Sequence, residues 1–148
     1  MWTPRHSAKL SLILTDIIFL IAVIAGIFLP LITSRYIELT GKSQSLRTVL
    51  ITVCYCCLPF AAAALFTLRR LLKNILKSKA FIGENVRLLR ILSWCCTAVA
   101  LITLISGYFY LPFYIAGTAA GFIALILRVI KNIFCTAIEL KNENELTI

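Results

Sequence analysis

The chain has 148 residues, of which 61% are hydrophobic and 14% are charged, and its formal net charge is +9. Soluble domains average about 25% charged residues, so this composition excludes an ordinary soluble domain and is typical of a membrane protein. In such a protein, excess Lys and Arg indicate which loops stay in the cytoplasm beside anionic lipid, and direct nucleic-acid binding is not expected.

Four apolar runs follow one another along the chain. A helix rises about 1.5 Å per residue and needs about 20 residues to cross some 30 Å of hydrocarbon. The first three runs reach this length, and the fourth does so if Arg128 snorkels at its end. We therefore predict an all-α membrane protein in which residues 1–148 form one domain with four transmembrane helices. The expected spans are about residues 10–32, 48–68, 91–111 and 110–130.

The first run contains Asp16, the one acidic residue within a predicted span. Placing a carboxylate inside a membrane costs free energy, so such a residue marks a candidate functional site. At about 1.5 Å per residue, Asp16 lies about 7–8 Å and Arg128 about 9 Å from the membrane midplane, both in the cytoplasmic half. We therefore predict an intramembrane ion pair between Asp16 and Arg128 that locks the first helix to the fourth, with a proton or cation site as the alternative.

The second and third runs contain most of the six cysteines. Cys54, Cys56 and Cys57 fall in the outer half of one span, whereas Cys95 and Cys96 fall in the inner half of the next. A depth difference of roughly 10–15 Å is too large for one tetrahedral site. We expect reduced thiols that fill space, with no metal and no other cofactor.

A polar hairpin, residues 69–90, connects the second and third runs. Apolar residues recur at helical spacing up to Leu76, which predicts that the second helix continues two to three turns beyond the membrane. The opposite face is basic and is expected to lie near anionic lipid or to bind a protein partner. The candidate contact residues are Arg69, Arg70, Lys73, Lys77, Lys79, Asn85 and Arg87.

The fourth run contains Gly117 and Gly121, whose spacing permits close helix approach. This spacing has two interpretations: close packing of two helices within one chain, or a homodimer interface. Beyond Arg128 the helix is expected to continue into the tail, residues 131–148, and to pack an apolar stripe against the basic hairpin. The stripe consists of Ile130, Ile133, Phe134, Ala137 and Ile138. The candidate partner contacts in this tail are Glu139, Glu143, Asn144 and Glu145.

The basic residues are distributed unevenly over the segments that connect the spans. Twelve lie in the N-terminus, the middle hairpin and the C-terminal region, and three lie in the first loop. By the positive-inside rule, both termini and the hairpin are expected in the cytoplasm, so helices two and four extend into it.

Two stretches resemble a known family. KAFIGENVRLLRILSW (79–94), together with the ending AIELKNENELTI (137–148), is similar to the bacterial membrane-protein family catalogued as domain of unknown function 2975. The resemblance covers essentially the whole chain, although Glu145 stands where Asp is commoner. It implies a bacterial cytoplasmic membrane and no assigned activity. Family genes often neighbour a small Cro-type helix-turn-helix regulator, which implies, by association, a membrane partner for such a regulator.

The sequence shows no nucleotide-binding glycine pattern and no catalytic triad at a common depth, so an enzyme is not expected. The leading hypothesis is a non-enzymatic membrane protein whose basic hairpin and tail bind a cytosolic partner, with a small helix-turn-helix regulator as the candidate. The alternative is a small dimeric cation or drug transporter that uses Asp16.

Overall fold

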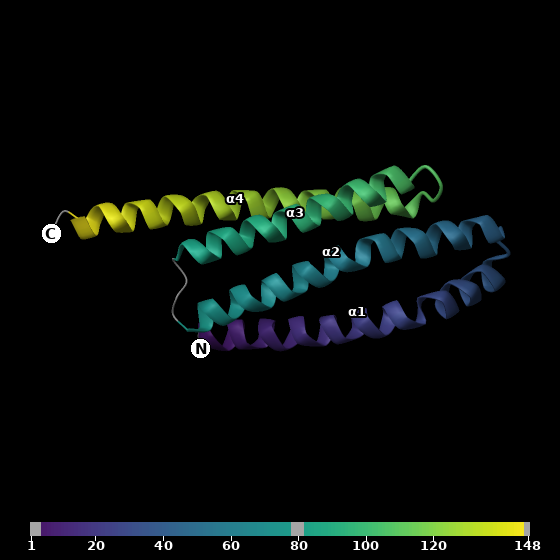
Figure 1. Cartoon of the computed structure of the whole chain (residues 1–148), viewed down its shortest axis with the longest axis horizontal. Coiled ribbons are helices and arrows are strands. Elements are labelled where there is room, and N and C mark those ends of the chain that lie inside the picture. Colours follow the sequence, from purple (N-terminus) through teal and green to yellow (C-terminus); the bar gives the residue numbers. More distant parts are fainter. Residues whose placement is uncertain (1–3, 78–81, 147–148) are drawn as a thin grey trace.

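The computed structural model describes residues 4–77 and 82–146, and the regular structure within these ranges is helical (Figure 1). The helices are α1 (Pro4–Thr40), α2 (Gln44–Leu76), α3 (Gly83–Ser106) and α4 (Pro112–Leu146). Each is long and apolar enough to cross a membrane. The predicted all-α membrane fold with four spanning helices is confirmed, as is the continuation of α2 and α4 beyond their apolar runs.

The four helices form a row rather than a closed bundle. Figure 1 shows them side by side in chain order, each antiparallel to the one before it. α1 packs on α2, α2 on α3 and α3 on α4; in the described ranges, no other pair of helices brings Cα atoms within 8 Å. Between helices surrounded by lipid no hydrophobic force favours closure, because lipid tails are as apolar as the side chains. The wide apolar faces of the row are therefore available to lipid.

α1 is longer than its apolar run because it continues through Pro30 to Thr40. A proline inside a helix leaves the carbonyl four residues earlier without its usual donor. Here that carbonyl belongs to Gly26, and the hydroxyl of Tyr55 on α2 donates to it over 3.2 Å. The hydrogen bond satisfies the freed carbonyl and ties α1 to α2 in the region where lipid offers no donor.

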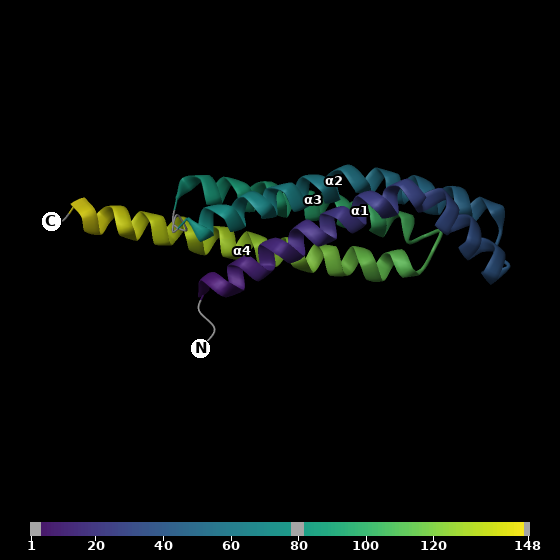
Figure 2. The same ribbon diagram turned by 90° about the horizontal axis from the view of Figure 1, so that it is seen from below.

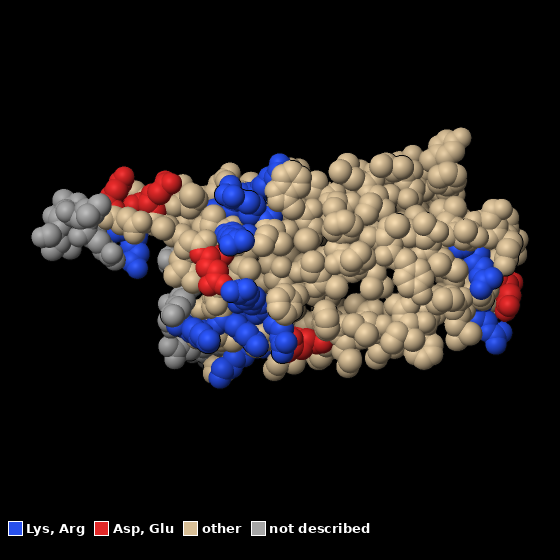
Figure 3. Space-filling model, in the orientation of Figure 1, with Lys and Arg blue, Asp and Glu red and all other residues tan. Residues whose placement is uncertain are grey.

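Charged residues gather at the two ends of the row and leave an uncharged band between them (Figure 3). We call the more positive one the basic end; it combines the start of α1, the end of α2, the start of α3 and the second half of α4. Its described cations are Lys9, Arg69, Arg70, Lys73, Lys77, Arg87, Arg90, Arg128, Lys131 and Lys141. The start of α1 and the last turns of α4 lie at this end, and α4 projects beyond the end of α2 and the start of α3 (Figures 1 and 2).

The opposite end is tied together by a small polar cluster. The hydroxyl groups of Tyr36 and Tyr110 are 2.7 Å apart, and the Nζ atom of Lys42 donates to Tyr36 over 3.2 Å. Lys42 also lies over the Tyr110 ring, 4.7 Å from its centroid. The hydrogen bond to Tyr36 raises the pKa of Lys42, which keeps its ammonium group charged. This cluster links the end of α1 to the turn between α3 and α4.

Candidate functional site at the basic end

The basic end is built on an apolar core shared by three helices. Leu71 of α2 packs with Leu88 and Leu89 of α3, and all three are buried. Ile130 and Phe134 of α4 pack against them. The expected packing of the α4 extension on the hairpin is confirmed for these two residues, whereas Ile133 of the same stripe is 60% exposed. The core fixes α4 beside the hairpin as far as Phe134.

Asn85, in the first turn of α3, is fully enclosed by this end of the molecule. Its Oδ1 atom accepts a hydrogen bond of 2.9 Å from Nδ2 of Asn74 on α2. An enclosed side chain cannot touch a partner or lipid, so the predicted contact role of Asn85 is wrong. Because its amide is directed toward α2, it joins the two arms of the hairpin instead.

Replacing Asn85 with alanine is expected to lower the free energy of unfolding by about 1 kcal/mol, because Asn74 loses its partner while remaining half-buried. Unfolding of the purified protein by SDS in mixed micelles, followed by circular dichroism, measures this change. Asn142→Ala, on the exposed tail, is the matched control and should change stability by less than about 0.5 kcal/mol. Equal stability of the two variants would contradict this role of Asn85.

Asp16 is paired with Arg69, not with Arg128. The Nε atom of Arg69 lies 2.8 Å from Oδ1 of Asp16, and a second guanidinium nitrogen donates to Oδ2 over 3.2 Å. The predicted Asp16–Arg128 pair is wrong because α1 neighbours α2 alone in the row of described helices. Two parallel hydrogen bonds to one carboxylate form the geometrically most specific kind of ion pair.

Other predicted contact residues are distributed around the hairpin. Arg70 is paired with Glu84 at the start of α3, with 2.6 Å between nitrogen and oxygen. This ion pair connects the two arms of the hairpin, as the Asn74–Asn85 hydrogen bond does. Lys73, Lys77 and Arg87 are exposed, and Lys79 lies outside the described residues.

The last turns of α4 form the predicted tail as a continuous helix. Glu139, Glu143 and Asn144 are exposed on it, while the side chain of Glu145 lies outside what the structure describes. These turns project past the end of α2 and the start of α3 in both views of the ribbon (Figures 1 and 2). The tail therefore presents a largely polar helical surface beyond the packed core.

Gly117 and Gly121 face α3 of the same chain. A Cβ atom added at Gly117 would lie 2.7 Å from Cγ of Leu104 and 2.9 Å from Oγ1 of Thr103, distances that leave no room for a side chain. At Gly121 the nearest atom would be Cβ of Ala100 at 3.8 Å. The structure thus places Gly117 in the tight contact between α3 and α4 of one chain, with Gly121 at the edge of that contact.

Sequence reasoning missed Ser93, a fully buried residue whose hydroxyl donates to the carbonyl of Ala124 over 3.0 Å. The stretch ILSW offered one signal for it, because the hydroxyl of Ser93 stands alone among apolar residues.

The six cysteines are unpaired thiols. Among the described residues, no three His, Cys, Asp or Glu side chains gather in a way that could hold a metal ion.

Comparison with known families shows which family the chain matches. The family model described as protein of unknown function (DUF2975) matches residues 31–148. No curated protein and no solved structure matches the chain. A function must therefore be argued from the geometry of the chain itself.

Proposed function

Because the chain belongs to the DUF2975 family of proteins of unknown function, we propose its function from the geometry of the basic end. It is a non-enzymatic multi-pass membrane protein that binds a cytosolic protein partner through the hairpin and the projecting turns of α4. The small helix-turn-helix regulator suggested by the family resemblance is the candidate partner.

The distribution of charge supports a cytoplasmic location for the basic end. Twelve of the 15 Lys and Arg residues belong to segments at that end, and three belong to the opposite end. Segments rich in Lys and Arg remain on the cytoplasmic side during insertion. The exposed cations Lys73, Lys77 and Arg87 would then lie beside anionic lipid headgroups, which attract them.

The observation that carries the proposal is the projection of α4 beyond the hairpin. Phe134 is its last residue that packs on the described core, Ala137 and Ile138 after it are half-buried, and the helix continues to Leu146. A few isolated helical turns gain little stability in water without a packed apolar face. Leu140 on these turns is 56% exposed, so an apolar surface remains for a partner to cover.

The charge of the projecting turns indicates the chemistry of that partner. On the tail of this cationic protein, Glu139, Glu143 and Glu145 outnumber Lys141. Opposite charge accelerates association and selects the partner, so a basic protein is favoured. A DNA-binding regulator has such a surface.

The experiment that tests this function is co-expression of the tagged chain with a small helix-turn-helix regulator of the kind that the family resemblance implies. Deleting Glu139 to Ile148 is expected to reduce co-purification of the regulator at least about tenfold, as loss of a binding hot spot does. A variant with Glu139→Gln, Glu143→Gln and Glu145→Gln keeps the length of the helix and should show a smaller loss. Undiminished co-purification after the deletion, with the protein still inserted and helical, would reject the proposal.

The alternative, a dimeric transporter that uses Asp16, has no comparable support. The carboxylate of Asp16 is already paired with Arg69. The cavity beside the pair has a volume of about 40 Å³, which suits about one water molecule rather than a drug. We therefore do not propose transport.

A further inference from the structure

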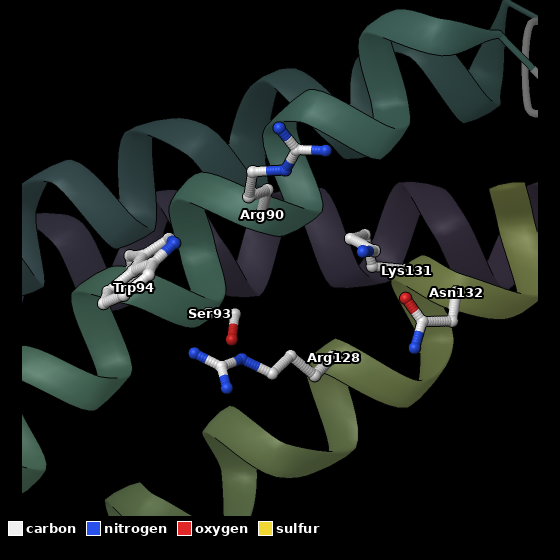
Figure 4. Close-up of a pocket in the computed structure, with 6 residues that line it drawn as sticks. All are labelled: Arg90, Ser93, Trp94, Arg128, Lys131 and Asn132. Carbon is white, nitrogen blue, oxygen red and sulfur yellow. The ribbon is translucent and has the colours of Figure 1, made fainter.

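A cationic pocket lies between α3 and α4 at the basic end (Figure 4). Its volume is about 330 Å³, and three of its six lining residues are cations. The lining is Arg90, Ser93 and Trp94 from α3 with Arg128, Lys131 and Asn132 from α4. Figure 4 shows Arg128 reaching from α4 toward Ser93 and Trp94, and its Cζ atom lies 5.4 Å from the centre of the Trp94 ring.

No described carboxylate forms an ion pair with the cations of this pocket. Arg69 and Arg70 on α2 are paired with Asp16 and Glu84. In the part of the chain that the structure describes, Arg90, Arg128 and Lys131 make no ion pair. Three like charges around one cavity repel each other, and an anion placed between them removes that repulsion.

An apolar groove continues from the pocket along the same two helices, toward the uncharged band. Its volume is about 280 Å³, and Arg128 lines both spaces. The other lining residues are Thr97, Ala100, Leu101, Gly121, Ala124 and Leu125. On α3 they come after the pocket residues and on α4 before them, in both cases at intervals of three and four, so groove and pocket share one face. The small side chains of Ala100, Gly121 and Ala124 leave the groove open.

We propose that the pocket and groove together form a binding site for an anionic phospholipid. The phosphate lies among Arg90, Arg128 and Lys131, and an acyl chain lies along the groove. Arginine binds phosphate with paired N–H donors, and Trp94 suits the boundary between headgroups and hydrocarbon. Basic pockets between spanning helices are known sites for anionic headgroups. The adjoining groove favours a lipid over a free phosphate ion, and this inference does not depend on the proposed protein partner.

The test uses fluorescence of the full chain in phosphatidylcholine vesicles. Trp2→Phe leaves Trp94 as the single tryptophan. A small fraction of host lipid is replaced by phosphatidylglycerol with brominated acyl chains, which quench nearby tryptophan, or by phosphatidylcholine brominated in the same way. We expect phosphatidylglycerol to bind at least about tenfold more strongly than phosphatidylcholine, since each cation contributes about fivefold.

Charge-matched variants distinguish the pocket from general surface charge. Arg90→Gln, Arg128→Gln and Lys131→Gln together should abolish the preference for phosphatidylglycerol. Lys73→Gln, Lys77→Gln and Arg87→Gln together remove the same charge from the hairpin and should retain it. If the pocket variant does not fold, Lys131→Gln alone should still lower the preference about fivefold.

Three results would overturn the proposal. The first is equal quenching of the parent protein by the two brominated lipids. The second is an equal loss of preference in the pocket and hairpin variants, which would indicate only general surface charge. The third is complete displacement of the brominated phosphatidylglycerol by soluble glycerol phosphate at equal concentration, which would indicate a site for a free phosphate compound.

Discussion

Replacing Gly117 with leucine is expected to separate α4 from α3 and to lower the free energy of unfolding by about 3 kcal/mol. The new Cβ atom alone would stand 2.7 Å from Cγ of Leu104 and 2.9 Å from Oγ1 of Thr103. The branched leucine adds more atoms in the same direction, so either α4 moves outward or both side chains leave their rotamers. Unfolding in SDS mixed micelles, followed by circular dichroism, measures the loss.

The second glycine of the same face is the control for this prediction. A Cβ atom at Gly121 would lie 3.8 Å from Cβ of Ala100, an ordinary van der Waals contact. Gly121→Ala should therefore change stability by no more than about 0.5 kcal/mol. If Gly117→Leu is as stable as Gly121→Ala, the close approach of α3 and α4 at Gly117 is incorrect.

The number of helices could be predicted from the sequence because it depends on quantities that a sequence contains. Run length and composition decide whether a segment can cross about 30 Å of hydrocarbon. Helical periodicity in the stretch ending at Leu76 similarly predicted the continuation of α2. The end of α1 was harder to place, since Pro30 usually limits a helix, and its tolerance here depends on Tyr55 in another helix.

The arrangement of the helices around one another could not be predicted in the same way. Position along a helix gives the depth of a residue and says nothing about which helix lies beside it. Asp16 and Arg128 have similar predicted depths, yet their helices are separated by α2 and α3 in the row. Arg69 lies on α2, the helix that packs directly on α1, but its place in the helical pattern predicted that it lies on the exposed face of the hairpin.

The burial of single polar residues could not be predicted from the sequence either. Asn85 follows Gly83 and Glu84 at the start of a helix, a position where a polar residue is usually exposed or caps the helix. Its enclosure depends on Asn74, which supplies a donor from the other arm of the hairpin. A pair of asparagines flanking a predicted turn is the signal that could have indicated this contact.

The pairing of charges divides the basic end into two parts. On the side of α1 and α2, Asp16 neutralises Arg69, and Glu84 neutralises Arg70. On the side of α3 and α4, the three pocket cations have no such partner among the described carboxylates. The first part is therefore suited to holding helices together, and the second to binding an anion from outside the chain.

The ion pair between Asp16 and Arg69 gives the second large prediction. Arg69→Leu leaves the carboxylate of Asp16 beside Phe19, Leu65 and Phe66, which line the adjoining cavity. The Asp16 side chain is 44% exposed, so an unpaired charge there is expected to lower the free energy of unfolding by about 2 kcal/mol, less than at the centre of a membrane. Adding Asp16→Asn to Arg69→Leu removes the unpaired charge and should recover most of the lost stability. A double-mutant cycle, with unfolding in SDS as the readout, measures the coupling energy of the two residues.

Arg128 provides the control for this cycle, because it lies against Trp94 on the other side of the row. Arg128→Leu should be additive with Asp16→Asn to within about 0.5 kcal/mol, as expected for residues that share no contact. A coupling energy that is larger for Asp16 with Arg128 than for Asp16 with Arg69 would mean that α1 packs beside α4. The helices would then close into a bundle, and the apolar faces left open by the row would be buried against each other.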